Sequence, residues 1–375
     1  MRIGIDATAL PPEPVGAGNY IIHLVRALAS LDSDDEWVIF AQEHARNLIG
    51  VPACDRLEWR LIPDQSPARR LAWEQARFPS IIQESRLELL HSPHYTRPVR
   101  LSCASVVTLH DMTFFLYPQL HTRIKRLFFP RMIRYSARHA DALITISDHT
   151  RRDAIRILHI PEDKITSIPL GIHPDFHPIQ DQHALDICRE KYRLPQTFIL
   201  YVGLVEPRKN LPVLFEAYQQ LLQRCQPPPL VIAGRMGWGV EQVMQQVKQL
   251  GLQDKLIFPG YVDASDLPQV YNLAQVFVYP SRYEGFGFPP LEAMACGTPT
   301  ITSAVSAMLD HVGQAAVLVE PDNPQALSAA IFGLLTQPEK CKRLALAGPQ
   351  QAARFTWAET ARQTRALYQK VLSKR

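Results

Sequence analysis

Short apolar runs alternate with helical patterns along nearly the whole chain. Residues 2–6 form an apolar run typical of a buried strand, and a set of apolar residues from Ile21 to Leu28 then repeats with the i, i+3, i+4, i+7 spacing of one helix face. This alternation predicts an α/β fold, in which parallel strands are joined by crossover helices. The next apolar runs of the first half lie at 36–40, 57–62, 105–110 with Ala104 before it, and 141–147.

The alternation lapses between about 170 and 195, where several Pro and His residues stand, and we interpret the lapse as the connection between two domains. We therefore predict two Rossmann-like doubly wound domains, 1–175 and 176–375, that face each other across a ligand cleft. The tail from about 325 is expected to form two or three helices, and the last of them, about 356–375, is a candidate to pack back on the first domain. The expected strands of the second half lie at 198–203, 230–234, 255–258, 274–280, 298–303 and 316–320.

Length and composition fit this two-domain prediction and narrow the class of protein. The 375 residues suit two domains, and a net charge of +4 does not by itself argue for nucleic acid, so no nucleic-acid partner is expected. No apolar stretch has the length of a signal-peptide core or a spanning helix, which favours a cytoplasmic location. The cysteines stand singly, as in a reduced compartment, at positions 54, 103, 188, 225, 296 and 341.

A glycine-rich segment that includes Gly16 and Gly18 precedes the first expected helix. Glycines there let the backbone approach a phosphate, and the helix N-terminus favours an anion. A dinucleotide fingerprint would need Gly or Ala at position 21, which is Ile, so an NAD enzyme is disfavoured. The alternative is a flexible loop without a ligand.

Two adjacent cations, Arg208 and Lys209, follow a strand of the second half, and Asn210 after them is a candidate N-cap. Cations at a helix N-terminus oppose the helix dipole, so an anion held between them would explain the pair. Arginine can bind a phosphate with two hydrogen bonds, and lysine adds a point charge. A solvated basic loop is the alternative.

The segment 281–300 carries two glutamates. Glu284 lies in a glycine-rich loop, and Glu292 is predicted in the first turn of a helix that begins with Pro289 and Pro290. The spacing of the two glutamates does not exclude the acid and base of a hydrolase. Loop amides beside a helix N-terminus better suit an anionic ligand, with the carboxylates accepting hydrogen bonds from sugar hydroxyls. The alternative for Glu284 is an acidic residue of a surface loop, and that for Glu292 is an ordinary acidic residue in the first turn of a helix.

Polar residues also end strands of the first half, where this type of fold places its chemistry. His110 follows one strand, and His91 and His94 flank the end of another. Pro93 disfavours a helical pairing of these two histidines as metal ligands, so no metal is expected. The Asp32-Ser33-Asp34 segment matches the Asp-x-Asp pattern of metal-dependent sugar transferases, but it directly follows the first helix, and we interpret it as a polar turn.

The cations and apolar residues interspersed over 121–140 predict a basic amphipathic helix, with Pro130 as a candidate kink. Such a helix is a candidate for peripheral contact with an anionic membrane at its inner face. The alternative is a crossover helix with one buried face. Its cations are Arg123, Lys125, Arg126, Arg131, Arg134 and Arg138.

Five segments together resemble glycosyltransferase family 4, and more narrowly its mannosyltransferase-like members, over nearly the full length. They are GAGNY (16–20), TLHDMTFFLYP (108–118), TISDHTRRD (145–153), VGLVEPRKNL (202–211) and EGFGFPPLEAMACGTP (284–299). The resemblance implies a retaining, metal-independent hexosyltransferase of GT-B fold that acts in polysaccharide biosynthesis without a cofactor. It also implies transfer of a sugar from a nucleotide-sugar donor, GDP-mannose, to a glycan or lipid-linked acceptor.

The resemblance further implies roles for individual residues. Arg208 and Lys209 would bind the donor diphosphate, and Glu292 would hold the ribose of the nucleotide. His110 would lie against the sugar near the reacting carbon, as a catalytic residue together with Arg208, Lys209 and Glu284. The remaining donor contacts would come from Gly16 and Gly18 over the diphosphate, from Gly234, Arg235, Tyr261 and Val262 at the base, and from Glu284, Gly285, Phe286, Gly287 and Phe288 at the sugar.

One segment departs from the family pattern, and two other functions stay open. Leu309 and Asp310 stand where the family usually has Pro and Glu, so the helix start and the donor fit are expected to differ there. The alternative functions are a sugar-nucleotide epimerase or phosphorylase on the same fold, and a catalytically inactive scaffold protein that binds sugar nucleotides.

Overall fold

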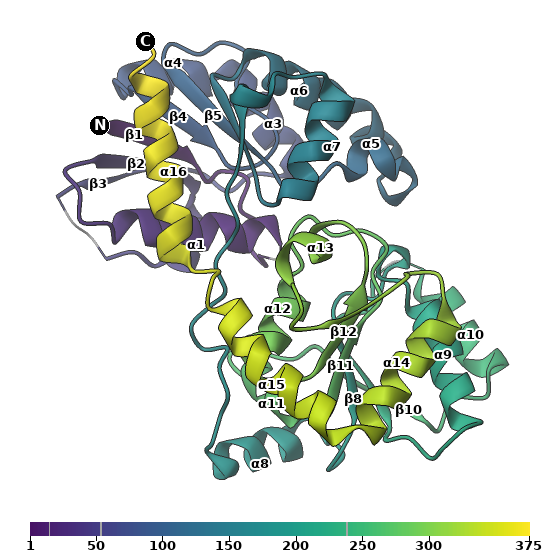
Figure 1. Ribbon diagram of the computed structural model, residues 1–375. Helices are drawn as coiled ribbons and strands as arrows, with labels where there is room; N and C mark the ends of the chain where they lie inside the picture. The colour runs from purple at the N-terminus through teal and green to yellow at the C-terminus, as the bar shows by residue number, and fades with distance from the viewer. Residues whose placement is uncertain (15, 53–54, 238) are drawn as a thin grey trace. The chain divides into compact units, whose positions relative to one another are not determined.

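The computed structural model describes residues 1–14, 16–52, 55–237 and 239–375. They form two compact units, which Figure 1 shows coloured along the chain. Unit 1 comprises Met1–Gly171 and Thr356–Arg375, and unit 2 comprises Ile172–Phe355. The chain passes from unit 1 to unit 2 at 171/172, against the boundary at 175/176 expected from the sequence, and its last helix lies in unit 1.

Unit 1 is built on a seven-stranded parallel sheet in the order β3-β2-β1-β4-β5-β6-β7. Ile3 on β1 lies opposite Trp37 on one side and Leu89 on the other. The inner strands are buried almost throughout, as expected for a parallel sheet with both faces covered. The strands are β1 (Arg2–Asp6), β2 (Glu36–Gln42), β3 (Leu57–Ile62), β4 (Leu89–Ser92), β5 (Ala104–Leu109), β6 (Ala142–Thr145) and β7 (Ile165–Ser167).

The helices of unit 1 include the first and the last helix of the chain. Helix α1 (Ala17–Ala29) buries its predicted apolar face, and α16 (Trp357–Leu372) packs against it (Figure 1). The hydroxyl of Tyr368 on α16 lies 2.6 Å from Nδ1 of the buried His91 on β4. The remaining helices are α2 (Glu43–Ile49), α3 (Pro67–Ala76), α4 (Phe78–Glu84), α5 (Thr113–Leu116), η1 (Pro118–Leu120), α6 (Arg123–His139), α7 (Asp148–Leu158) and η2 (Glu162–Lys164).

Unit 2 has a six-stranded parallel sheet in the order β10-β9-β8-β11-β12-β13. Leu200 on β8 lies opposite Val231 on β9 and Phe277 on β11. The strands are β8 (Ile199–Val202), β9 (Leu230–Ala233), β10 (Leu256–Gly260), β11 (Val276–Tyr279), β12 (Thr300–Ser303) and β13 (Val317–Val319). The helices are α8 (Gln182–Lys191), η3 (Pro207–Lys209), α9 (Leu211–Leu222), α10 (Val240–Gln249), α11 (Leu267–Leu273), α12 (Phe288–Ala295), α13 (Ala307–His311), α14 (Pro324–Thr336) and α15 (Pro338–Ala352).

Two of these elements were missed in the sequence. The short edge strand β7 was not predicted, and helix α8 lies inside the segment interpreted as a connection. The carboxylate of Asp181 accepts hydrogen bonds from two amides at the start of α8, and Leu185 and Cys188 enter the core of unit 2. Asp181 is an N-cap of the preferred type, so the signal for a helix was present.

Two further properties of the described residues concern membrane-spanning helices and the state of the cysteines. No helix in the described ranges is both long enough and apolar enough to cross a membrane. The cysteines in these ranges are free thiols, and Cys54 lies outside the described residues.

The strand order reverses between β1 and β4 in unit 1 and between β8 and β11 in unit 2. Sheets of this kind bind ligands at the carboxyl ends of the strands beside the reversal. The loops after β8 and β11 hold Arg208, Lys209 and Glu284, so the fold brings these three residues to one sheet edge.

Candidate functional site

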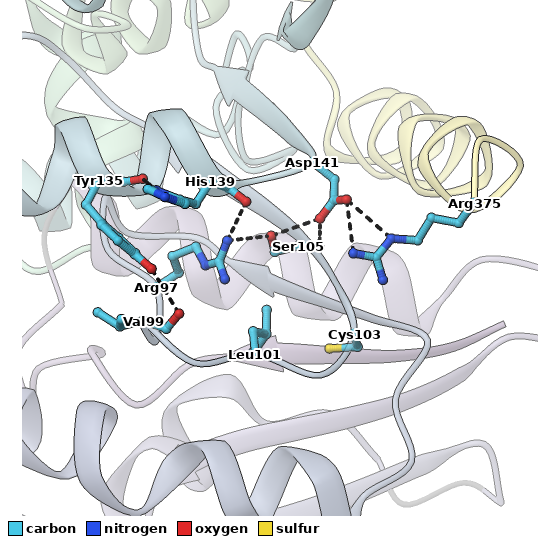
Figure 2. A pocket seen from close by; sticks show the side chains of 9 residues that line it. All are labelled: Arg97, Val99, Leu101, Cys103, Ser105, Tyr135, His139, Asp141 and Arg375. Carbon is cyan, nitrogen blue, oxygen red and sulfur yellow. Dashed lines mark hydrogen bonds and ion pairs between the residues drawn. The ribbon is translucent and has the colours of Figure 1, made fainter.

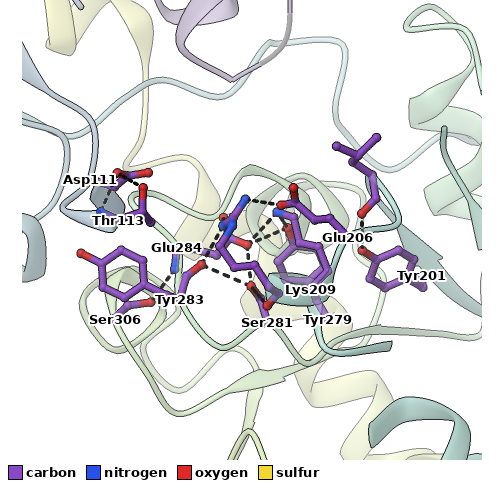
Figure 3. Close-up of polar contacts among 12 residues, drawn as sticks. Asp111, Thr113, Tyr201, Glu206, Lys209, Tyr279, Ser281, Tyr283, Glu284 and Ser306 are labelled. Atoms are coloured by element: carbon purple, nitrogen blue, oxygen red, sulfur yellow. Dashed lines mark hydrogen bonds and ion pairs between the residues drawn. The ribbon is translucent and has the colours of Figure 1, made fainter. Parts of the chain in front are cut away.

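A buried polar cluster lies at the reversal point of unit 2 (Figure 3). Lys209 comes from the turn η3 after β8, while Tyr279 ends β11 and Glu284 follows it. The two loops are joined through the backbone, because the amide of Arg282 donates to the carbonyl of Arg208 at 3.0 Å. The two predicted segments, 202–211 and 284–299, therefore meet in space.

Glu284 is the centre of this cluster, and only 8% of it is exposed. Its Oε1 accepts hydrogen bonds from Lys209 Nζ at 2.7 Å, from the Tyr279 hydroxyl at 3.0 Å and from the Ser281 hydroxyl at 2.6 Å. Its Oε2 pairs with Nη1 of Arg208 at 2.8 Å. The interpretation of Glu284 as a surface-loop acid is wrong, and so is that of Lys209 as part of a solvated loop, because both side chains are buried.

The charges of the cluster fix its protonation. Burial alone would raise the pKa of Glu284, but the positive charges of Arg208 and Lys209 outweigh burial and lower that pKa to about 2. Burial and repulsion by Arg208 lower the pKa of Lys209, while attraction to Glu284 opposes the fall. Since Lys209 donates to both Glu284 and the Tyr279 hydroxyl, we take it as protonated at neutral pH.

Arg208 is held by a second carboxylate that the sequence did not single out. Its Nη2 lies 2.8 Å from Oε1 of Glu206, and its Nη1 donates to the carbonyl of Tyr283 at 2.7 Å. Two carboxylates thus balance two cations, so the group formed by Glu206, Arg208, Lys209 and Glu284 has no net charge. Glu206 could have been found as the acidic residue nearest to the Arg208–Lys209 pair.

Asn210 stands at the N-cap position of α9 but does not cap it. Its backbone is left-handed, with φ of 59°, and its side chain makes no capping hydrogen bond. The side-chain amide instead donates to the carbonyl of Pro321 at 2.6 Å. The prediction of a side-chain N-cap was wrong, because the residue fastens the loop after β8 to the segment after β13.

The glycine-rich loop after Glu284 is tightly packed. Gly287 has φ of 91° and precedes α12, a conformation that favours glycine, and a Cβ on it would lie 1.9 Å from Cε of Met308, whose side chain would have to move. Phe286 is buried against His311, which leaves its backbone rather than its side chain for a ligand. Gly285 and Phe288, the other candidates here, are partly exposed. Pro289 and Pro290 carry no N–H group, so the first turn of α12 offers few donors to an anion.

Glu292 lies one to two residues farther into α12 than predicted. The helix begins at Phe288, which places Glu292 at its fifth residue and outside the first turn. Its Oε2 accepts a hydrogen bond from the hydroxyl of Tyr271 at 2.9 Å. Burial raises the pKa of Glu292 to about 7, although the Tyr271 hydrogen bond acts in the opposite direction. This carboxyl group is therefore partly protonated at neutral pH, unlike that of Glu284.

The base-site candidates gather at the ends of β9 and β10. Gly234 has φ of 139°, and a Cβ on it would lie 2.1 Å from the carbonyl oxygen of Gly203 after β8, so only glycine fits. The guanidinium of Arg235 lies 4.4 Å from the ring centroid of Tyr261, which is 52% exposed, whereas Val262 is buried. This edge therefore offers an exposed aromatic ring beside a cation.

The glycine pair of unit 1 lies at the start of α1. Gly16 stands at the N-cap with φ of 49° and is exposed, whereas Gly18 is buried. A Cβ on Gly18 would lie 2.9 Å from Cβ of Pro14, so close packing against the preceding loop explains that glycine without a ligand.

His110 directly follows β5 and is buried. Its Nε2 donates to the carbonyl of Pro93 at 2.7 Å, which makes Nδ1 the acceptor atom of the neutral ring. Burial lowers the pKa values of His110, His91 and His94, so all three rings are neutral at pH 7. Nε2 of His91 lies 2.8 Å from the Thr108 hydroxyl, so both of its ring nitrogens have partners within the protein.

Three further sequence features have a structural outcome. The Asp32-Ser33-Asp34 segment forms the bend between α1 and β2, as predicted. Helix α13 begins at Ala307, two residues before Leu309, which is 51% exposed. Among the described residues, no three His, Cys, Asp or Glu side chains gather as metal ligands would.

Comparison with known proteins places both halves of the chain in one group of enzymes. The family model Glycosyltransferase Family 4 matches residues 14–176, and the model Glycosyl transferases group 1 matches residues 187–351. O-antigen chain mannosyltransferase B of Escherichia coli is 33% identical over 368 residues, which cover 93% of this chain and 94% of that protein. Serotype-specific mannosyltransferase WbdA of Escherichia coli is 34% identical over 226 residues, which cover 59% of this chain and 28% of that protein.

Solved structures share the fold. Sucrose-phosphate synthase from Thermosynechococcus elongatus superposes with a TM-score of 0.78 at 22% identity, over the full length of both chains. WaaG, a glycosyltransferase involved in lipopolysaccharide biosynthesis, gives 0.72 at 17% identity over 97% of this chain and 98% of its own. The predicted α/β class with two Rossmann-like sheets is confirmed. The chain therefore belongs to glycosyltransferase family 4, with a GT-B fold, and within that family it is similar to mannosyltransferases.

Proposed function

We propose that this glycosyltransferase moves mannose from GDP-mannose to a growing polysaccharide of the O-antigen type, with retention of anomeric configuration and without a metal ion. The observation that carries the proposal is the buried Arg208–Lys209 pair gathered on Glu284 at the reversal point of unit 2. The similarity to an O-antigen mannosyltransferase over nearly its whole length supports the choice of sugar.

The charge balance of the cluster suggests how the pair would act. In the free protein Arg208 and Lys209 are neutralised by Glu206 and Glu284. A donor diphosphate would share these cations, and its negative charge would grow as the bond from the sugar carbon to the phosphate oxygen breaks. Cations fixed in advance stabilise such growing charge without reorganisation. Glu284 would then hold the sugar, and His110 would accept a hydrogen bond at Nδ1.

Retention follows if the acceptor attacks from the side on which the diphosphate leaves. The bonding electrons of the breaking bond go to the phosphate oxygen, and the acceptor oxygen forms the new bond to the sugar carbon. The acceptor proton passes to the phosphate oxygen, so the reaction needs no protein nucleophile.

A panel of nucleotide sugars tests the donor assignment by thermal stabilisation. A ligand that binds the folded protein raises its melting temperature by mass action, even when no acceptor is known. We expect GDP-mannose to raise the melting temperature most, and UDP-sugars to raise it less. Stabilisation by UDP-glucose but not by GDP-mannose would contradict the proposed donor.

The metal-free reaction has its own test. Because Arg208 and Lys209 would supply the charge that a divalent cation supplies in other transferases, we expect full transferase activity in excess chelator. Complete loss of activity that manganese restores would overturn this part of the proposal.

Glu292 gives the site a predicted pH dependence. The ionised carboxylate can accept hydrogen bonds from both ribose hydroxyls, so donor binding favours the deprotonated form. With a free-state pKa of about 7, donor affinity should weaken about tenfold between pH 8 and pH 6. Calorimetric titration with GDP-mannose, whose phosphates do not titrate in this range, measures the effect. In Glu292→Gln the affinity should be lower at pH 8 and nearly constant with pH, whereas an unchanged pH profile would contradict the ribose contact.

A further inference from the structure

A polar cavity lies at the amino ends of two neighbouring strands of unit 1 (Figure 2). Ser105 stands near the start of β5, Asp141 directly precedes β6, and the crossover between β4 and β5, residues 93–103, supplies much of the remaining wall. The volume of about 250 Å³ is slightly below that of a site for a drug-sized ligand, so the cavity suits a small molecule. His110 follows the opposite, carboxyl end of β5, so the cavity is separate from the sheet edge that carries this histidine.

Arg97 brings a buried charge to the wall of this cavity, and only 6% of the residue is exposed. Its Nη1 donates to the carbonyl of His139 at 2.6 Å and to the hydroxyl of Ser105 at 3.2 Å, as Figure 2 shows. Its Nε donates to the carbonyl of Pro98 at 3.1 Å. Over the described residues, Arg97 forms no ion pair and its Nη2 makes no hydrogen bond. The two N–H groups of Nη2 are therefore left for a ligand in the cavity.

The charge of Arg97 lacks compensation within the protein. A guanidinium stays protonated in proteins, and burial of a charge is unfavourable unless an opposite charge balances it. Burial lowers the pKa of Arg97 and repulsion by Arg375 adds to the fall, while Tyr135 and Asp141 act against it. An anion held in the cavity would supply the missing counter-charge.

Asp141, the carboxylate of the cavity wall, is already engaged by other groups. It accepts hydrogen bonds from the amide and the hydroxyl of Ser105 at 2.8 Å and 3.1 Å, and from Nη2 of Arg375 at 3.1 Å. The positive charges of Arg97 and Arg375 against the one negative charge of Asp141 leave a net charge of +1. Lys164 adds to the positive potential, since burial lowers its pKa and the charge of Arg97 acts in the same direction.

We propose that this cavity binds a phosphate group, either of inorganic phosphate or of a small phosphorylated compound, with Nη2 of Arg97 as the main donor. A guanidinium fits phosphate oxygens with two parallel hydrogen bonds, and Arg375 adds a second cation at the wall. A phosphate group carries up to two negative charges near pH 7, which suits this pair of arginines better than a carboxylate does. Val99 and Leu101 give an apolar wall for carbon atoms attached to the phosphate, and the Cys103 thiol is neutral because burial raises its pKa to about 11.

The crossover that carries Arg97 also contacts His110. The carbonyl of Pro93 accepts a hydrogen bond from Nε2 of His110 at 2.7 Å, and the rings of Tyr95 and His110 lie 5.5 Å apart. A phosphate on Arg97 would therefore fix one end of a segment whose other end positions His110. We expect the amides of residues 93–103 to exchange hydrogen more slowly when phosphate is bound.

Calorimetric titration of the whole protein with inorganic phosphate, in the presence of GDP, tests the proposal. We expect one phosphate per chain with a dissociation constant of about 1 mM or lower, and binding of acetate at least about tenfold weaker. A hexose 6-phosphate serves as the second probe. Tighter binding of this compound would identify a phosphorylated compound as the source of the group, and equal or weaker binding would identify inorganic phosphate.

Variants of the cavity wall locate the binding. Arg97→Gln should bind phosphate at least about tenfold more weakly. Because Arg97 also holds acceptors of the fold, Val99→Asp is the second variant, which places a repelling carboxylate on a side chain that is 45% exposed and should lose a similar factor while the protein stays folded. Val99→Thr is the matched neutral control and should bind as the unaltered protein does.

Lys209→Met, which alters the cluster of unit 2, should also keep its phosphate affinity, and this result would separate the two sites. Unchanged phosphate affinity in Val99→Asp, equal affinity for acetate, loss of binding in Lys209→Met, or slower hydrogen exchange only outside residues 93–103 would each overturn the proposal.

Discussion

Replacing Lys209 with Ala should lower turnover by about 10²- to 10³-fold and leave unit 2 folded. Lys209 Nζ lies 2.7 Å from Glu284, inside a buried cluster where no solvent charge can take its place. Glu284 keeps three other donors in the variant, because Arg208, Tyr279 and Ser281 are unchanged. The loss therefore falls on stabilisation of the leaving diphosphate rather than on the fold. Steady-state kinetics with GDP-mannose, together with circular dichroism, measure both quantities.

Two companion variants make this prediction specific. Lys209→Met keeps the length and packing of the side chain but removes its charge, so it should lose as much turnover as Lys209→Ala. Lys248→Ala removes an exposed cation of α10 in the same unit and should leave turnover unchanged. Normal turnover in Lys209→Met would show that the charge of Lys209 has no catalytic role.

Replacing Glu284 with Gln should destabilise unit 2 by about 3–5 kcal/mol and abolish activity. The substitution keeps the shape of the side chain but removes its negative charge. The buried cations Arg208 and Lys209 are then balanced by a single carboxylate, that of Glu206, which pairs with Arg208. Since the pKa of Glu284 is about 2 in the folded protein, its contribution to stability is complete above the ordinary glutamate pKa and is lost as the pH falls toward 2. Urea denaturation measures the free energy of unfolding of both proteins. The difference between Glu284→Gln and the unaltered protein should therefore be smaller at pH 3 than at pH 7.

The nucleotide offers a second readout for the same variant. Because a diphosphate would replace the missing negative charge, GDP should raise the melting temperature of Glu284→Gln more than that of the unaltered protein. Glu190→Gln, at an exposed position of α8, is the control and should change neither stability nor the effect of GDP. Unchanged stability in Glu284→Gln would contradict the charge balance described for the cluster.

The strands were predictable because their signal is local. Most strands of both sheets are short runs of buried apolar residues that lie between a helix and a polar loop, so composition and spacing suffice to predict them. The exceptions have physical reasons. The edge strand β7 has only three residues, and α8 was hidden by the Pro and His residues on either side of it.

The partners of the site residues were much less predictable. The sequence placed Arg208 and Lys209 around an external anion, but in the free protein the anions are Glu284 and Glu206. The pairing of the two cations with these carboxylates requires that two loops meet at the reversal point of the sheet. That meeting follows from the strand order and not from any local pattern. Asn210 was misassigned for the same reason, because its partner, the carbonyl of Pro321, is distant in the sequence.

The position of Glu292 illustrates a smaller uncertainty of sequence patterns. The Pro-Pro pair suggested a helix start at those residues, whereas Gly287 with its positive φ starts the helix earlier. The start one to two residues earlier places Glu292 outside the first turn, where it lies beside Tyr271 and burial raises its pKa. Two glutamates of one motif thereby acquire opposite pKa shifts, which no spacing rule could have indicated.

The most direct test of the donor chemistry follows GDP-mannose by proton NMR in excess chelator, with the unaltered protein and with Lys209→Met. Without an acceptor, water should slowly take its place, so that GDP and free mannose appear together. The released mannose should first show the anomeric configuration that it has in the donor, and Lys209→Met should release both products at least about 10²-fold more slowly. First release of the opposite anomer, conversion to another sugar nucleotide, or equal release by Lys209→Met would contradict the proposed retaining transfer at Arg208 and Lys209.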